Sequence, residues 1–514
     1  MTQDIIHLLL ALLPLAWLFV GIAKIKMPLY LVGITSLLLA AVISHLGFSF
    51  SPLLLAQASI EGFLIALFPI IHVILGALFV YSVSVESGGI EDVKALLMKV
   101  SPDRRIQGLL IAFAFGGFLE SVTGFGTSVA IPAGILISMG FKPLRAAVLC
   151  LVANTVPVAF GLLGVPVITL ARITALPVDI LSVFTALQLS PIIILLPLVL
   201  VVIITRQLKG LGGVAVFALG SGIMFAAGQT LTAWFIGPEL PAVVGAIAAG
   251  GFLVGAARMF PVKHPWTFEE KENTSPKQDI VIPPARALAA VSPYIIILGL
   301  TLVLRIPVIA AIFKNNIFSP GITVYSGEGA KSVEIAWATG AGTILLLSGV
   351  ISGIIQKLSI RRIGRAMWHT MKKIGLTAVT VLSIVALARV MTYSNMVGSI
   401  AAAAGTFGMF FPLVSPFIGM LGTFLTGSDT SSNILFGSLQ KQSAIAAGVS
   451  PEWLAAANTS GATAGKMISP QSLSIAAAST GLAGREKELF KGTVLFCIAY
   501  VAVMAVIVFV YTLF

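Results

Sequence analysis

The sequence predicts an all-α polytopic membrane protein, with about twelve transmembrane helices, two re-entrant hairpins and two broken helices in inverted repeats. Its 514 residues are 58% hydrophobic and only 10% charged, and the mean hydropathy is +1.06. A soluble protein of this length needs far less apolar sequence. Two polar, helix-breaking islands interrupt the apolar runs. Unwound backbone at membrane depth is tolerated only where protein buries it or water reaches it.

The two islands read alike although they lie far apart in the chain. The first spans residues 117–128 and the second 422–433. Each is followed by an Asn-Thr pair, a Gly and a Pro, at Asn154, Gly161 and Pro166 and at Asn458, Gly465 and Pro470. The Asn-to-Gly and Asn-to-Pro separations are the same in both copies. Small residues at membrane helix contacts are ordinary, but matched spacing favours a true repeat, which is a pointer to a transporter's binding site.

Each element follows from the length of its apolar run, because a bilayer-spanning helix needs about 20 residues. Runs of that length lie at 5–23, 28–47, 61–84, 181–205, 212–236, 240–258, 286–305, 336–356, 374–391 and 491–513. The first is too long for a signal-peptide core and is expected to be retained. The runs 145–175 and 451–480 are predicted as broken helices. Regions 107–140 and 408–447 hold two short apolar halves each, which favours re-entrant hairpins.

Orientation follows from Lys and Arg, which concentrate in cytoplasmic loops. The basic clusters fall on one face if both termini are outside, the first hairpin enters from the cytoplasm and the second from outside. Residues 1–210 and 286–514 then form inverted repeats. Residues 211–285 link them with two spans and a polar cytoplasmic loop, and 306–335 form an external loop.

Composition excludes several function classes. The net charge of +12 sits mostly in short loops between apolar runs, so nucleic-acid binding is not expected. The two cysteines lie inside apolar runs and the five histidines are scattered, so neither a disulfide framework nor a metal site is predicted. No cofactor-binding, catalytic or nucleotide-binding motif is present. We therefore expect a transporter driven by an ion gradient rather than an enzyme.

Candidate substrate-binding residues come from the islands and their neighbours. Broken helices and hairpin tips present helix N-termini, which bind carboxylates, beside hydroxyl and amide side chains. The polar candidates are Thr123, Gly124, Gly126, Thr127, Ser128, Asn154, Thr155, Ser428, Thr430, Ser431, Asn433, Asn458, Thr459 and Gln471. The alternative is that these groups satisfy only one another and their own backbone.

Ionisable residues within apolar sequence are the stronger signal, because each is costly at the bilayer centre. Glu120 and Asp429 lie in the islands and are the candidates to carry a proton. Arg389 and Lys466 could face a substrate carboxylate. Alternatively, Arg389 is an interfacial anchor and Lys466 pairs with one of the acids. His72 is a further proton-carrier candidate, although a packed histidine explains it as well.

With those residues in hand, the chain resembles the L-lactate permease family, which includes glycolate permeases. The resemblance covers nearly the whole chain. It rests on residues 115–126, 141–144, 153–161, 387–389, 424–433 (Phe-Leu-Thr-Gly-Ser-Asp-Thr-Ser-Ser-Asn), 457–461 and 465–472. The chain departs from the family pattern at 121–123, where small residues are expected, and at Ser128, where Pro is expected. Both departures lie in the first hairpin tip, where they bear on the choice of substrate.

The resemblance implies proton-coupled uptake of L-lactate, D-lactate or glycolate across a prokaryotic inner membrane, by a monomer or homodimer surrounded by lipid. Inverted hairpins are also similar to those of the ion transporter superfamily, whose members move by an elevator mechanism; this is an analogy of fold. A sodium-coupled carboxylate transporter is the main alternative. A channel or a membrane enzyme is less favoured, since the islands are isolated patches without a catalytic constellation.

Overall fold

The protein is built almost wholly from helices in the computed structural model. The structure describes residues 2–25, 27–89, 91–92, 100–123, 126–262, 264–267, 283–313, 317–328, 330, 332–482 and 485–513. Within this part, the only strands are β1 (Gly321–Ile322) and β2 (Val333–Glu334), which pair antiparallel. They belong to a loop that we call the strap, residues 317–340.

The first elements form three of the predicted spans, and the third is kinked. They are α1 (Thr2–Ala23), α2 (Leu29–Gly47), α3 (Pro52–Ile65), the π-helical turn η1 (Ala66–Ile71) and α4 (His72–Glu86). Phe68 leaves helical geometry at φ −131° and ψ 116°. It precedes Pro69, and proline disfavours helical backbone at the residue before it. The predicted span 61–84 is therefore two helices meeting at a break.

The next elements form a helical hairpin followed by a bent pair of helices. The hairpin is α6 (Arg104–Gly108), η2 (Leu109–Phe115), α7 (Gly116–Thr123) and α8 (Thr127–Ser138). Its first arm, Arg104–Val122, is long and apolar enough to cross a membrane, so the expectation that both arms are too short is wrong for this arm. The broken helix is α9 (Pro143–Ala153), η3 (Val158–Phe160) and α10 (Gly161–Thr174), bent by 63°. Then come α11 (Val178–Thr205), η4 (Leu208–Leu211), α12 (Ala215–Phe235) and α13 (Pro241–Met259).

The later part of the chain repeats the order of hairpin, broken helix and long helix. It begins with α14 (Pro284–Arg305), α15 (Pro307–Phe313), α16 (Ala341–Ile355), α17 (Ile360–Tyr393), α18 (Met396–Gly405) and η5 (Gly408–Phe410). The hairpin is α19 (Phe411–Thr426) and α20 (Asp429–Ala447), the broken helix is α21 (Pro451–Lys466) and α22 (Pro470–Ser479), and the last helix is α23 (Glu486–Tyr511). Helix α18, which the apolar runs do not reveal, meets α19 at 101°.

The second break is not at the Asn-Thr pair, which corrects the sequence expectation. Asn458 and Thr459 lie inside the continuous α21, and the chain breaks at 467–469 instead. The local cause of the break is the start of α22. Pro470 occupies the first turn of α22, and Ser469 caps this helix by accepting a hydrogen bond from the Ser472 N–H. Proline at a first turn and a serine cap are both typical of a helix start.

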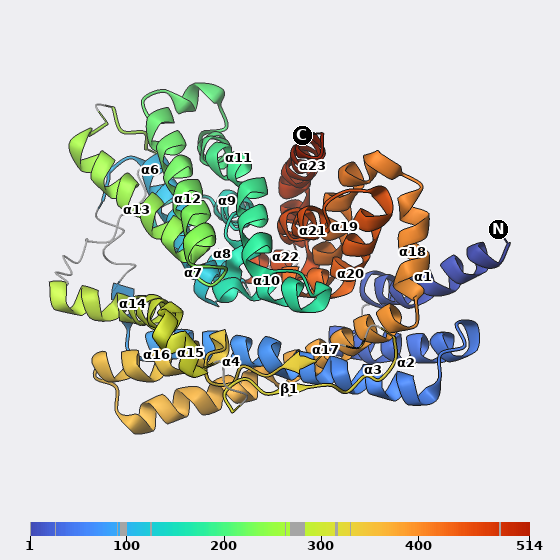
Figure 1. Cartoon of the computed structure of the whole chain (residues 1–514). Coiled ribbons are helices and arrows are strands. Elements are labelled where there is room, and N and C mark those ends of the chain that lie inside the picture. Colours follow the sequence, from blue (N-terminus) through green and yellow to red (C-terminus); the bar gives the residue numbers. More distant parts are fainter. Residues whose placement is uncertain are drawn as a thin grey trace.

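Figure 1 shows a long lower layer of helices with two bundles above it. In the lower layer α17 packs against α2, α3 and α4, and α16 packs against α4 and α14. One bundle contains the first hairpin with α9 and α11–α13, and the other contains the second hairpin with α21 and α23. Helices α10, α20, α8 and α22 join the two bundles, because α10 packs on α20 and α22 packs on α8.

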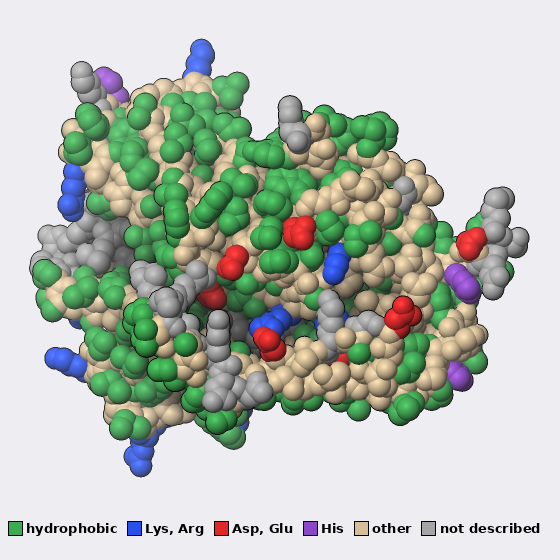
Figure 2. All heavy atoms as spheres, viewed as in Figure 1, with side chains coloured by type: hydrophobic (Ala, Val, Ile, Leu, Met, Phe, Trp, Pro, Cys, Tyr) green, Lys and Arg blue, Asp and Glu red, His purple; other side chains and the backbone are tan. Residues whose placement is uncertain are grey.

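The surface and the helix lengths confirm a membrane protein. Among the described residues, seven helices are long and apolar enough to cross a membrane, or up to nine if each bent pair is one span. Of the other spans expected from the sequence, α16 is short and α3–α4 is kinked. Figure 2 shows hydrophobic side chains over α12 and α13, where Val216, Leu231, Trp234 and Phe235 are exposed. A large exposed apolar face in a helical protein is suited to lipid.

Candidate functional site

Both hairpin tips turn at a glycine and close on the same short helix. Gly126 has φ 82° and Gly427 has φ 70°, a left-handed conformation that costs other residues free energy. A Cβ atom at Gly126 would lie 2.7 Å from the Ile475 Cδ1, and one at Gly427 would clash with the side chain of Gln471. Both partners belong to α22. The two hairpins, far apart in sequence, therefore converge on α22, the second half of the second broken helix.

Replacing Gly427 with Ala should destabilise the protein and reduce transport, because the variant combines a left-handed backbone with a steric clash. Strain at such a position costs about 1–3 kcal/mol. Gly448→Ala is a matched control, since Gly448 has φ 71° but no atom within 4 Å of the added Cβ. Thermal unfolding and substrate uptake of both variants check this. Equal losses in the two would show that the Gln471 contact is unimportant.

A cavity of about 360 Å³ lies where the hairpin tips meet the lower layer, and we call it the hairpin-tip cavity. Its bundle side is formed by α7, α10, the second hairpin tip and the break after α21. Its lower-layer side is formed by Tyr30, Ile74, Leu376, Thr380 and Val381. The predicted site residues that line it are Glu120, Ser428, Asp429, Thr430, Ser431, Lys466 and Gln471. Two halves of the chain and both structural layers thus contribute to one space.

Three charged residues share this cavity, but only two of them are paired. The Lys466 Nζ lies 3.6 Å from the Glu120 Oε1, and the Ser128 hydroxyl donates a hydrogen bond to the other Glu120 oxygen. Asp429 is 3% exposed, and neither of its carboxylate oxygens has a hydrogen-bond partner in the described part of the chain. It nevertheless lies within electrostatic reach of Lys466 and Glu120. A buried acid without a bonded partner is costly when ionised.

Asp429 and Lys466 lie at helix ends whose dipoles favour their charges. Asp429 is the first residue of α20, and Lys466 is the last residue of α21. An acid at a helix N-terminus and a base at a C-terminus both interact favourably with the helix dipole. Ser428 caps α20 by accepting a hydrogen bond from the Ser431 N–H. The residues of this first turn, Ser428–Ser431, line the cavity together with Gln471.

Three predicted residues form a buried network instead of lining the cavity. The Asn433 oxygen accepts hydrogen bonds from the Asn458 amide and the Thr459 hydroxyl, at 2.9 Å each. The Asn433 amide donates to the Pro166 carbonyl on α10 at 3.0 Å, and the Asn458 oxygen accepts from Gln440. This network ties the second hairpin to both broken helices. It is what allows α21 to continue through its polar pair.

The first Asn-Thr pair differs, because α9 ends there. Thr155 donates to the carbonyl of Val152, which is the local alternative expected for such hydroxyls. Asn154 is buried, and neither side-chain atom has a hydrogen-bond partner among the described residues. Of the remaining candidates in the first tip, Gly124 lies outside the described residues, as do the side chains of Thr123 and Thr127.

Arg389 and His72 lie away from the hairpin tips. They line a second cavity beside the strap. The Arg389 Nε is 3.5 Å from the Glu61 carboxylate, and the Tyr393 hydroxyl donates to Glu61 at 2.7 Å. The sequence reading does not single out Glu61 or Tyr393. The sequence signal that could have found Glu61 is an acid at the edge of an apolar run, and the structure buries this residue.

Helical hairpins and broken helices that converge on a charged cavity between two structural layers define a multi-pass membrane transporter. A family model described as L-lactate permease matches residues 7–514. An L-lactate permease of Streptococcus iniae is 40% identical over 452 residues, 87% of this chain and 93% of that protein. The glycolate permease GlcA of Escherichia coli K12 is 33% identical, over 97% of this chain and 94% of that protein.

The solved structure of Neisseria gonorrhoeae MtrF, from a class of antimetabolite efflux pumps, has a TM-score of 0.52 at 16% identity. It covers 88% of this chain and 83% of that one, which supports the fold alone. The chain belongs to the L-lactate permease family. The relatives in this family are named permeases, which are membrane transporters and not enzymes.

Proposed function

We propose that this transporter carries small 2-hydroxy monocarboxylates, namely L-lactate, D-lactate and glycolate, into a prokaryotic cell across the inner membrane together with protons. The observation that supports coupling is the difference between the two acids of the hairpin-tip cavity. Glu120 has a cation at 3.6 Å and a hydroxyl donor, whereas the described residues offer Asp429 no hydrogen bond. Asp429 then loads the proton, and Glu120 stays ionised beside Lys466.

The charges of the cavity give the coupling a physical reason. With Glu120 and Asp429 ionised and Lys466 protonated, the three side chains carry one net negative charge. A substrate carboxylate would add a second in a buried, weakly screened space. Protonation of Asp429 removes its repulsion of the substrate carboxylate. The three side chains then carry no net charge, and the substrate contributes the only remaining charge. Substrate and proton therefore favour each other's binding, as linked equilibria require.

The substrate carboxylate fits the first turn of α20, where N–H groups and the helix dipole attract an anion. Ser428, Thr430 and Ser431 surround this turn, and Lys466 and Gln471 face it across the cavity. The 2-hydroxyl group of the substrate needs a donor and an acceptor, which a threonine hydroxyl or the Gln471 amide supplies. Asn433, Asn458 and Thr459 are not proposed to contact the substrate. Their hydrogen bonds hold the second hairpin against the broken helices.

The proposed movement is of elevator type, with the lower layer as the scaffold. Both hairpins and both broken helices form the transport unit. Helices α11 and α23 belong to it too, because α11 packs on α21 and α9 and α23 packs on α19 and α21. The hairpin-tip cavity lies between this unit and α2, α4 and α17, where sliding would expose it to one side and then the other.

The two halves, 1–210 and 286–514, are proposed to be inverted repeats, and cysteine labelling tests this. A cysteine at Lys142, beyond the first hairpin, and one near Gly448, beyond the second, should react with a membrane-impermeant thiol reagent from opposite sides. A cysteine at Lys209 is the control expected on the side of Lys142. Both native cysteines are buried, which keeps the background low. Labelling of all three from one side would contradict inversion.

Transport in proteoliposomes tests the proposed function. An imposed pH gradient should drive accumulation of radiolabelled lactate or glycolate, and an imposed sodium gradient at equal pH should not. Unlabelled substrate on the far side should accelerate uptake, which a carrier shows and a channel does not. Accumulation driven by sodium alone would favour the sodium-coupled alternative. Loss of trans-stimulation would favour a channel.

A further inference from the structure

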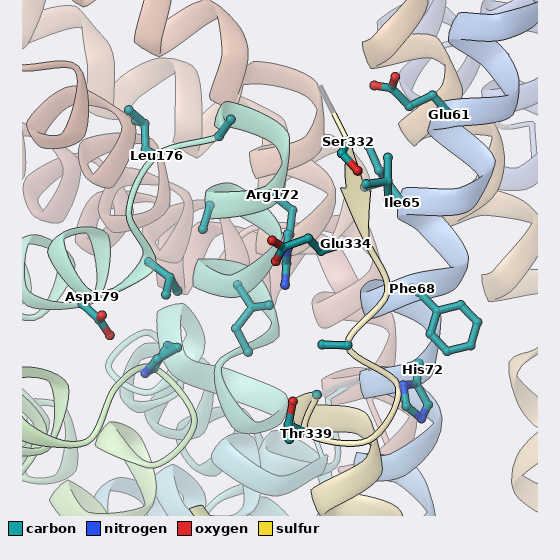
Figure 3. Close-up of a pocket in the computed structure, with 18 of the residues that line it drawn as sticks. Glu61, Ile65, Phe68, His72, Arg172, Leu176, Asp179, Ser332, Glu334 and Thr339 are labelled. Carbon is teal, nitrogen blue, oxygen red and sulfur yellow. The ribbon is translucent and has the colours of Figure 1, made fainter. Parts of the chain in front are cut away.

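A second cavity of about 520 Å³ lies next to the strap, and we call it the strap cavity (Figure 3). One wall is the lower layer, with Glu61, Phe68, His72 and Arg389. A second wall is the end of α10 and the start of α11, and the strap closes a third side with Ser332 and Glu334. Acidic and basic side chains gather along this line between the bundles and the lower layer (Figure 2).

The strap cavity continues the hairpin-tip cavity along the same helices. Helix α10 lines the hairpin-tip cavity at Pro166 and the strap cavity at Arg172. Helix α17 does the same at Val381 and Arg389, which are eight residues or about 12 Å apart along a helix. Ile74 and His72 repeat the pattern on α4. The two cavities therefore lie in series at the interface between the scaffold and the transport unit.

Two guanidinium groups enter the strap cavity from opposite walls. Arg389 donates from Nη2 to the Arg172 carbonyl at 3.3 Å, so the two residues are neighbours. The Arg389 Nε is buried and makes no hydrogen bond to any described residue. No ion pair joins the Arg172 side chain to an acid in the described part of the chain. Incompletely satisfied guanidinium groups are the side chains best shaped to bind a carboxylate with two hydrogen bonds.

The acids of the cavity leave that binding capacity available. Glu61 is held by the Tyr393 hydroxyl, and its 3.5 Å separation from Arg389 is longer than a hydrogen bond. Asp179 and Glu239 also line the cavity, and each makes an interaction of its own. Glu334, on β2, is exposed. Among the described residues, Glu61 is the only acid that forms an ion pair with either arginine.

We propose that the strap cavity is a second carboxylate-binding site, in which Arg172 and Arg389 hold the substrate carboxylate before it reaches, or after it leaves, the hairpin tips. The proposal rests on the proposed function for its substrate, and it adds a separate place of binding. Arg172 belongs to the transport unit and Arg389 to the scaffold. Both arginines therefore line one site only when the transport unit and the scaffold have the relative position seen in this structure.

Binding to the full-length protein in nanodiscs tests the second site. Wild-type protein should bind about two molecules of radiolabelled glycolate per chain at saturation, and Arg172→Gln should bind about one. Arg172→Lys, which keeps the charge but loses the planar fork, should weaken the second site at least tenfold. Arg258→Gln, at an exposed position on α13, is the charge-matched control and should bind as wild type does. One molecule per wild-type chain would overturn the proposal.

A labelling measurement locates the site independently of stoichiometry. Ser332→Cys places a thiol on the strap wall of the cavity, and glycolate should slow its reaction with a charged thiol reagent. The protection should disappear in the Arg172→Gln background and persist with Asp429→Asn. No protection, or equal protection by chloride, would overturn a carboxylate site. Failure of pH-driven uptake alone would refute proton coupling and leave this result standing.

Discussion

Asp429→Asn should abolish the accumulation of substrate driven by a pH gradient while leaving exchange of substrate for substrate running. Asn has nearly the same shape as Asp but cannot take up a proton, and exchange moves no net proton. The variant should also fold normally, because Asp429 makes no hydrogen bond to the described residues that Asn would lose. The removal of a buried carboxylate without a hydrogen-bond partner should even be neutral or stabilising.

Glu120→Gln is the comparison that separates the two acids. If Glu120 carried the proton, the same pattern of lost accumulation and retained exchange would appear in Glu120→Gln and not in Asp429→Asn. Accumulation by both variants in response to the pH gradient would show that neither acid is the carrier. His72, in the strap cavity, would then be the next residue to test.

Lys466→Met should cause the largest loss of stability among the site variants. It leaves Glu120 as a buried carboxylate with only the Ser128 hydroxyl bonded to it, and breaking a buried pair on one side costs about 3–5 kcal/mol. The double variant Glu120→Gln with Lys466→Met should recover most of that stability, because no uncompensated charge remains. Thermal unfolding of the two single variants and the double variant measures the coupling.

The double variant Glu120→Gln with Lys466→Met should not transport substrate, although its stability should recover. Lys466 lines the hairpin-tip cavity and is proposed to face the substrate carboxylate, so its charge is needed for binding as well as for pairing with Glu120. Recovery of both stability and uptake would show that the pair is only structural. A single Lys466→Met variant as stable as wild type would show that the ion pair contributes little.

The sequence predicts the parts of this site that depend on local chemistry. Each hairpin tip lies in a polar island of twelve residues that contains its turn glycine, Gly126 or Gly427. It leaves Lys466 with two possible partners, Glu120 and Asp429. The choice between them depends on where α21 ends relative to α7, which is a contact between residues 346 positions apart by their numbers.

Other features are set by contacts that no local pattern contains. The repeat predicts a helix break at Asn458, but Gln440 and Asn433 satisfy its side chain and α21 continues. The sequence places Arg389 shortly before the second hairpin, which suggests a position beside that hairpin. Helix α17 is long enough to place it instead beside Glu61 and Tyr393. The strap cavity is lined by the lower layer, by α10 and α11, and by the strap. The sequence of no single segment predicts it.

Substrate-evoked proton movement in proteoliposomes tests the central claim most directly. Addition of lactate or glycolate outside the vesicles, without any imposed gradient, should make the external medium more alkaline as protons enter with the substrate. A pH-sensitive dye and radiolabelled substrate report both fluxes in one sample. The account predicts proton movement with wild-type protein and none with Asp429→Asn, although the latter still exchanges substrate. Substrate entry without proton movement in the wild type, or proton movement retained in Asp429→Asn, would contradict it.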